Sequence, residues 1–234
     1  MDMIRCVWEH NGDDTLLYAV DYPGAYARGA SFEEAAAKLP REIAAYLRWA
    51  GIDAPVPEGV EVIEDAPCEL NMRDADSDVI FAAEREPMTR AEYEALKELA
   101  MKSAADFRAL YEYVPDKDAT CLAPRSTFYG DVPVTARAMY AHTRQVNSYY
   151  FGEIGVDADN DGDIDACRAR GFAALEAMPE ILTRPACEGS YGEWWSLRKV
   201  LRRFIWHDRI HARAMYRMAK RTFGAAQDVF RFEG

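Results

Sequence analysis

Beyond Glu86, hydrophobic residues recur at every third or fourth position over long stretches of the chain. The first stretch follows Pro87 and begins with Thr89 and Glu92, which stand in the capping-box spacing of a helix start. Four such stretches predict helices over about 89–114, 134–154, 164–178 and 192–223. Long amphipathic helices therefore make up most of the predicted fold.

The first third of the chain has a different pattern. Short runs of β-formers, broken by turn signals such as "NGDD", predict strands over 3–10, 15–22, 59–66 and 77–84. A helix is predicted over 31–51, with Ser31 as its N-cap and Gly51 at its end. Pro40 lies inside this helix and is expected to kink or split it.

These two patterns meet near residues 80–88. With 234 residues, the chain is long enough for two ordinary domains. The sequence therefore predicts an α+β protein, with a small α/β domain over 1–85 followed by a helical domain over 86–234.

The charge balance argues against nucleic-acid binding. The formal net charge is −12, so the surface should repel phosphate backbones. The densest basic group consists of Arg198, Lys199, Arg202 and Arg203, which fall inside the last predicted helix. We interpret this group as a solvated helix face.

Cysteine usage and hydropathy indicate the compartment. The five cysteines are scattered and odd in number, which favours reduced thiols over a disulfide framework. No window approaches the roughly 18 apolar residues that a membrane helix needs, and the N-terminus has no apolar leader segment. We expect a soluble cytoplasmic protein that does not bind membranes.

Two histidines, His207 and His211, lie four residues apart in "WHDRIH". Zinc proteases with H-E-x-x-H carry glutamate after the first histidine, where this chain has Asp208. The pair shares an otherwise apolar stripe of its helix, and His142 lies on a similar stripe of the helix over 134–154. If both stripes face the interior, three imidazoles converge and suit a divalent metal such as Zn, Ni or Fe. The alternative is that each histidine separately satisfies a hydrogen bond.

The segments "MYAHTRQVNSYYFGEIG" and "WHDRIHARAMYRMAKRTFG" resemble the two signature segments of the DinB-like superfamily. The resemblance extends from the helix near Thr89 to the C-terminus. It implies a four-helix bundle with up-down-down-up topology and a long crossover between its second and third helices. It also implies that His142, His207 and His211 bind a divalent metal.

Characterised members of this family include thiol-S-transferases that use mycothiol, bacillithiol or glutathione, with the metal activating the thiol. Other members have no known reaction, and some carry no metal. The resemblance thus implies a homodimer that acts on a small molecule as a metal-dependent thiol-S-transferase or hydrolase, with a low-molecular-weight thiol. The segment "HARAM" lacks the glycine and glutamine that often follow the last histidine, which leaves the identity of the thiol open.

The segment "YPGAYARGASFEEAAAKLPREIAAYL" resembles the HicB-like α/β domain, with its P-G-x-x-x-x-G-x-[ST]-x-x-E-A signature. The matching residues are Pro23, Gly24, Gly29, Ser31, Glu34 and Ala35. In antitoxins this domain binds a small ribonuclease toxin. The resemblance implies a packing or partner-binding module over 1–85. It provides an alternative function, a non-enzymatic partner-binding or regulatory protein with the helical bundle as a dimer scaffold.

The acidic stretch "DADNDGDIDACR" partly matches a calcium-binding loop. Asp157, Asp159 and Asp161 occupy the first three ligand positions, but Arg168 stands where the bidentate glutamate belongs. The stretch predicts at most weak calcium binding. The alternative is a polar connection between helices.

Four large side chains are candidates for lining a cavity beside the histidines: Tyr149, Phe204, Trp206 and Met215. Packing between helices is the alternative role for them. The sequence assigns a catalytic role to no residue.

Overall fold

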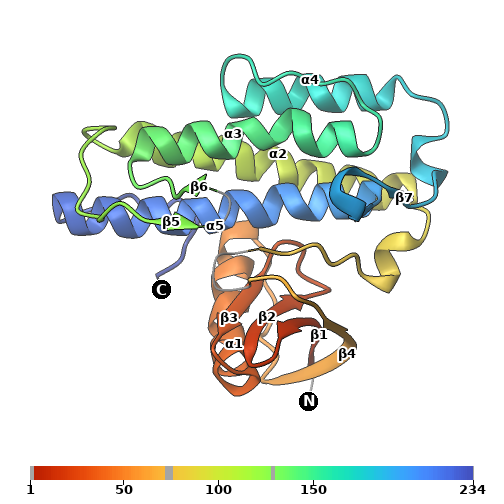
Figure 1. Ribbon diagram of the computed structural model, residues 1–234, viewed down its shortest axis with the longest axis horizontal. Helices are drawn as coiled ribbons and strands as arrows, with labels where there is room; N and C mark the ends of the chain where they lie inside the picture. The colour runs from red at the N-terminus through yellow and green to blue at the C-terminus, as the bar shows by residue number, and fades with distance from the viewer. Residues whose placement is uncertain (1–2, 72–75, 128–129, 234) are drawn as a thin grey trace.

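The computed structural model describes residues 3–71, 76–127 and 130–233 (Figure 1). Within these ranges the chain forms five α-helices and a four-stranded mixed sheet, which confirms the α+β class. The helices are α1 (Phe32–Ala50), α2 (Arg90–Tyr113), α3 (Ala136–Glu153), α4 (Ile164–Glu176) and α5 (Leu197–Phe223). The strands of the sheet are β1 (Met3–Asn11), β2 (Asp14–Ala19), β3 (Tyr26–Gly29) and β4 (Gly59–Pro67). Two-residue strands pair β5 (Ser126–Thr127) with β6 (Gly130–Asp131), and β7 (Cys187–Glu188) with β8 (Trp194–Trp195).

The sheet has the strand order β3-β2-β1-β4, with β1 antiparallel to β2 and parallel to β4. Both faces of β2 are buried. Leu17 belongs to the same core cluster as Leu39 of α1. Tyr18 points to the other face, where its ring lies 5.9 Å from that of Trp206 in α5. The sheet is therefore enclosed between α1 and α5, which explains the continuous apolar run of β2.

Helix α1 is one continuous helix, so the expectation that Pro40 splits it is wrong. Ser31 caps its start by accepting a hydrogen bond from the backbone N–H of Glu34, and Gly51 ends it in a left-handed conformation. Leu39, just before Pro40, and Ile43, almost one turn after it, are fully buried. Their packing against the sheet offsets the hydrogen bond that proline removes.

The strand expected over 77–84 is also wrong. This segment is irregular and then forms a 3-10 helix, Ala82–Arg85. The buried carboxylate of Glu9 accepts hydrogen bonds from the backbone N–H groups of Asp78 and Val79, both at 3.1 Å. It also accepts one from the hydroxyl of Ser77 at 2.6 Å. A side chain thus binds the backbone groups that a strand would offer to a neighbouring strand.

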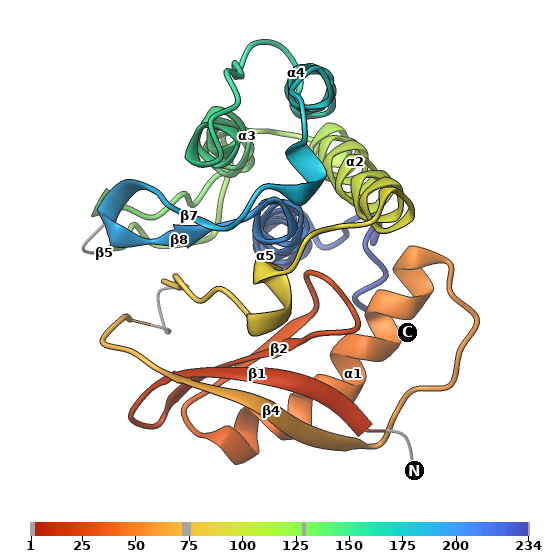
Figure 2. The same cartoon turned by 90° about the vertical axis from the view of Figure 1, so that its right-hand side faces the viewer.

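Helix α5 lies in the middle of the molecule (Figure 2). It packs against α2 and α3 on one side, and the 3-10 helix and the sheet lie on its other side. Helix α4 packs against α2 and α3, farther from the sheet. Gly24, in the turn between β2 and β3, allows close approach to α5, since a Cβ there would lie 2.5 Å from Cγ2 of Ile205.

The basic residues of α5 do not form a solvated face, which corrects the sequence interpretation. Lys199, Arg202 and Arg203 are buried, with exposed fractions of 0%, 4% and 8%. Arg202 forms an ion pair with Glu84, in which one guanidinium nitrogen lies 3.0 Å from a carboxylate oxygen. Arg203 donates a hydrogen bond to the backbone carbonyl of Ser77 at 2.6 Å. These cations hold the irregular segment 77–85 against α5.

A buried ion pair joins α5 to the other helices. Arg168 of α4 and Asp208 of α5 are both fully buried and form two hydrogen bonds, at 2.5 and 3.1 Å. Ser103 of α2 donates its hydroxyl proton to the same carboxylate at 2.5 Å. One aspartate therefore connects three helices through charge-assisted bonds.

Across the described residues, no helix is both long enough and apolar enough to cross a membrane.

Removing Asp208 should strongly destabilise the protein. In Asp208→Ala the guanidinium of Arg168 stays buried without its counter-ion, which should cost about 3–5 kcal/mol in the free energy of unfolding. Urea unfolding followed by circular dichroism measures this loss. The double variant Arg168→Met/Asp208→Leu removes both charges and should lose far less stability. Equal unfolding midpoints for Asp208→Ala and the unaltered protein would contradict the role of the pair.

Candidate metal centre

Two capped helices carry the three histidines that the sequence singles out. Helix α3 begins after Thr135, whose hydroxyl accepts from the backbone N–H of Ala138, and it carries His142. Helix α5 carries His207 and His211 one turn apart. Because α3 packs against α5, the two helices can present these side chains to each other.

The three imidazoles form one group. A ligand nitrogen from each of His142, His207 and His211 lies within 4.8 Å of the others. The ring centroids of His142 lie 5.2 Å from His207 and 4.6 Å from His211, and those of the α5 pair lie 4.4 Å apart. Among the described residues, this is the group of histidine, cysteine and acidic side chains close enough to bind a metal ion.

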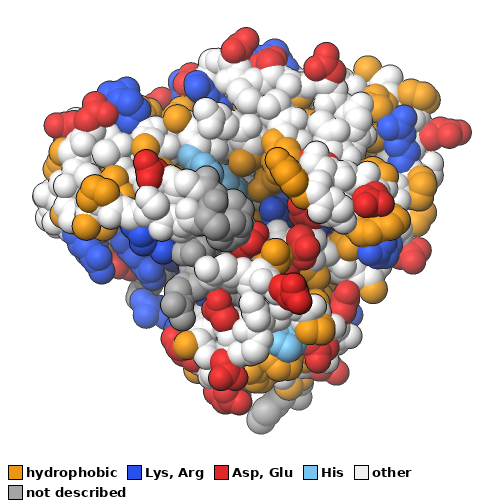
Figure 3. All heavy atoms as spheres, viewed as in Figure 1, with side chains coloured by type: hydrophobic (Ala, Val, Ile, Leu, Met, Phe, Trp, Pro, Cys, Tyr) orange, Lys and Arg blue, Asp and Glu red, His pale blue; other side chains and the backbone are white. Residues whose placement is uncertain are grey.

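The group extends from the interior to the surface. His207 is 7% exposed, His211 is half-buried, and His142 is exposed. Figure 3 shows a histidine surface among apolar side chains in the upper part of the molecule. On the inner side, the buried ring of Tyr150 lies edge-on to His207, with centroids 6.1 Å apart. Among the three rings, His142 therefore offers the most surface to a small molecule and His207 the least.

One nitrogen of the group has no protein partner. Nδ1 of His207 is buried and has no hydrogen-bond partner within the described residues. An unpaired buried polar atom costs on the order of 1–3 kcal/mol, so this nitrogen is free to bind a ligand that enters the group.

Desolvation lowers the pKa of all three rings. It acts even on His142, whose side chain is exposed but whose ring faces the other two histidines. Desolvation together with the charge of His142 and Arg28 lowers the pKa of His211 to about 3. Burial also takes the pKa of His207 well below its usual value, assisted by the neighbouring histidines and by Arg203. At neutral pH the imidazoles are therefore neutral, which is the form that binds metals.

Asp208 is turned away from the histidines. Its carboxylate binds Arg168 and Ser103, as expected from its position one residue after His207. It therefore does not orient the ring of His207.

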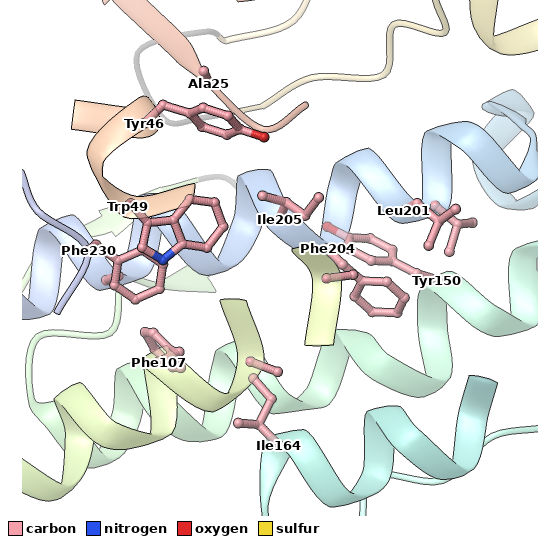
Figure 4. Packing of buried hydrophobic residues seen from close by; sticks show 14 of the residues in the cluster. Ala25, Tyr46, Trp49, Phe107, Tyr150, Ile164, Leu201, Phe204, Ile205 and Phe230 are labelled. Atoms are coloured by element: carbon pink, nitrogen blue, oxygen red, sulfur yellow. The ribbon is translucent and has the colours of Figure 1, made fainter. Parts of the chain in front are cut away.

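The four candidate lining residues lie in different environments. Phe204 is fully buried, and its ring lies 5.3 Å from that of Tyr150 in the core between the helices (Figure 4). Met215 is fully buried in the same core cluster. Trp206 faces the sheet, where it packs on Tyr18. Tyr149 packs edge-on against Trp195, with ring centroids 5.8 Å apart.

The acidic loop has the contacts of a helix connection. Asp159 binds Arg170 at 3.0 Å through the Nε atom, and Asn147 of α3 donates to the carbonyl of Asp159 at 2.7 Å. Arg168, at the last position of the loop pattern, is buried in its pair with Asp208. Asp157, Asp159 and Asp161 do not appear as a metal-binding group in the part of the chain that the structure describes.

Sequence reasoning did not foresee the cations around the histidines. Arg203 and Arg168 act electrostatically on His207, and Arg28 of β3 acts on His211. Arg28 is far from the histidines in the sequence and belongs to a strand that the sequence did not predict. No local signal could therefore have identified it.

Comparisons with known proteins give no relative for this chain: no protein-family model matches it, and neither the curated proteins nor the solved structures contain a match. The DinB-like and HicB-like resemblances therefore remain predictions.

Acid should destabilise the metal-free protein through these histidines. Because the pKa of His211 falls from 6.5 to about 3 on folding, the unfolded chain binds a proton there that the folded chain does not. The contribution of His211 to the free energy of unfolding is therefore complete above about pH 6.5 and is lost as the pH falls below that value. The loss is at most about 1.4 kcal/mol per pH unit for each such histidine. Urea unfolding with a chelator, at about pH 7.5 and about pH 5, measures the loss.

The variant His211→Gln removes one of the titrating rings and should lose less stability between the two pH values. His207→Gln/His211→Gln should lose still less. If all three proteins lost the same stability, burial of these imidazoles would not be the cause.

Proposed function

We propose that this chain is a metal-binding protein in which His142, His207 and His211 hold a divalent ion, within a DinB-like bundle formed by α2, α3, α4 and α5. The observation that carries the proposal is the convergence of the three imidazoles, with a buried nitrogen of His207 left unpaired. Separate hydrogen bonds for each histidine would not require the three ligand nitrogens to lie within 4.8 Å of one another.

The donor set fits a borderline transition metal. Three neutral imidazoles suit Zn, Ni or Fe, and a set of three protein ligands leaves positions open for other molecules. When bound, such an ion lowers the pKa of a coordinated water or thiol and so supplies a nucleophile at neutral pH. This chemistry corresponds to thiol transfer or hydrolysis.

The chain's own residues would shape the access of reactants. Tyr150 and Phe204 close the inner side of the group with buried aromatic rings, which exclude water there. His142 is the exposed member, so a substrate and a low-molecular-weight thiol would approach along α3. The cation Arg203 near His207 would favour an anionic nucleophile over its neutral form.

Taken with the DinB-like resemblance, these features support a metal-dependent thiol-S-transferase or hydrolase that acts on a small molecule, as a homodimer. In this proposal the N-terminal residues 1–85 form a HicB-like module that packs on α5 or binds a partner.

Elemental analysis of untagged protein tests the metal site. We expect close to one Zn, Ni or Fe per chain, lost in His207→Ala because the most buried ligand is gone. His10→Ala is the matched control, since His10 lies in β1 outside the group. Absence of metal in the unaltered protein, even after incubation with these ions, would contradict the site. The alternative, a non-enzymatic partner-binding protein, would then be favoured.

The proposed reaction is tested by thiol consumption. We expect the loaded protein to transfer glutathione, mycothiol or bacillithiol to an electrophile such as monochlorobimane, and a chelator to abolish the reaction. His207→Ala should lower the rate on the order of a hundredfold or more, since metal activation contributes several kcal/mol. Metal-independent rates with every thiol would contradict the reaction but not the metal site.

A further inference from the structure

A second candidate site lies on the other half of α5. A pocket of about 620 Å³ that opens to solvent is lined by β3, α1, the C-terminal part of α5 and the residues that follow it. Its walls carry five basic side chains: Arg28, Lys38, Arg41, Arg213 and Arg217. Figure 3 shows Lys and Arg side chains gathered at the lower left, below the C-terminal half of α5 in Figure 1. The chain carries a net charge of −12, so this local charge is opposite to that of the whole protein.

The two acidic residues of the pocket do not cancel its charge. Glu42 is buried and binds both Arg209, at 2.6 Å, and Arg213. Glu233 binds Lys220 at 2.6 Å. Each carboxylate is therefore already paired with a cation, and two of these cations lie outside the pocket wall. Within the wall, Arg213 is paired with Glu42, and Lys38 is paired with Glu34 at 2.5 Å.

Two arginines are available to a ligand. Arg41 and Arg217 are exposed, and neither forms an ion pair within the described residues. Desolvation and the nearby charges of Arg213, Arg221 and Arg28 lower the pKa of Arg217. An anion bound between them would relieve this repulsion.

We propose that this pocket binds a phosphate ester of a small organic molecule. A guanidinium group can donate two parallel hydrogen bonds to two oxygens of one phosphate. Several cations around one pocket also suit a dianion better than the single charge of a monocarboxylate. The volume lies within the range of about 300–1,000 Å³ that is common for ligand sites and exceeds the needs of a bare phosphate. The half-buried ring of Phe232 offers an apolar surface to the organic part.

The small extent of the basic surface distinguishes this ligand from a polyanion. A nucleic acid needs an extended basic surface, whereas these cations surround one pocket on an acidic protein. The inference rests on residues other than the three histidines and holds whether or not a metal binds there.

Isothermal titration calorimetry on the full chain at low salt tests the site, with adenosine monophosphate and ribose phosphate as probes. We expect at least one ester to bind with a Kd below about 1 mM, and adenosine and ribose not to bind. Arg41→Ala and Arg217→Ala should each weaken binding about tenfold or more, because each removes charged hydrogen bonds to the phosphate. Arg90→Ala removes the same charge from the exposed start of α2, outside the pocket wall, and should change the affinity less than about threefold.

Three results would overturn the proposal. The first is that neither ester binds. The second is that binding persists in Arg41→Ala/Arg217→Ala while circular dichroism shows an unchanged fold. The third is that inorganic phosphate binds as tightly as the esters, which would remove the assigned role of the organic part.

Discussion

The fold depends on charged side chains of α5 that are buried and paired on two sides of the helix. Toward the other helices, Asp208 binds Arg168 and Ser103. Toward the N-terminal region, Arg209 binds Glu42 of α1 at 2.6 Å. Charges removed from water are tolerated only with such partners, since an unpaired one costs several kcal/mol. The pairs therefore favour one rotation of α5 over others, in which these charges would lose their partners.

The α-helices were the most predictable part of the fold. Their apolar period and their caps are local, and both the Thr89–Glu92 box and the Ser31 cap form as the sequence indicates. The signal that ends α5 is also local, because Gly224 adopts the left-handed conformation there without a steric cost.

The environment of α5 was not predictable, because its partners are remote in the sequence. Arg202 lies 118 residues from Glu84, and Arg209 lies 167 residues from Glu42. A helix with many charged residues has the same sequence pattern whether those residues face water or pair with carboxylates from distant parts of the chain. The strand predicted over 77–84 was wrong for the same reason. The local pattern did not reveal that the side chain of Glu9, about 70 residues away, would bind the backbone of this segment. The convergence of His142 with the α5 pair followed from helical spacing, but their graded burial depended on how α3 packs.

The position of Asp208 links the fold to the candidate metal centre. Consecutive residues of a helix point about 100° apart. When Asp208 points toward α4, His207 must therefore point about 100° away from α4 around the axis of α5. In this structure that direction holds His142 of α3. The same rotation places Arg213, six residues after His207, against Glu42 of α1 and the basic pocket. A turn of α5 by a single residue would separate the imidazoles and bury the wrong charges. The buried pairs thus do more than stabilise α5, because they determine which of its faces meets the histidine of α3 and which lines the basic pocket.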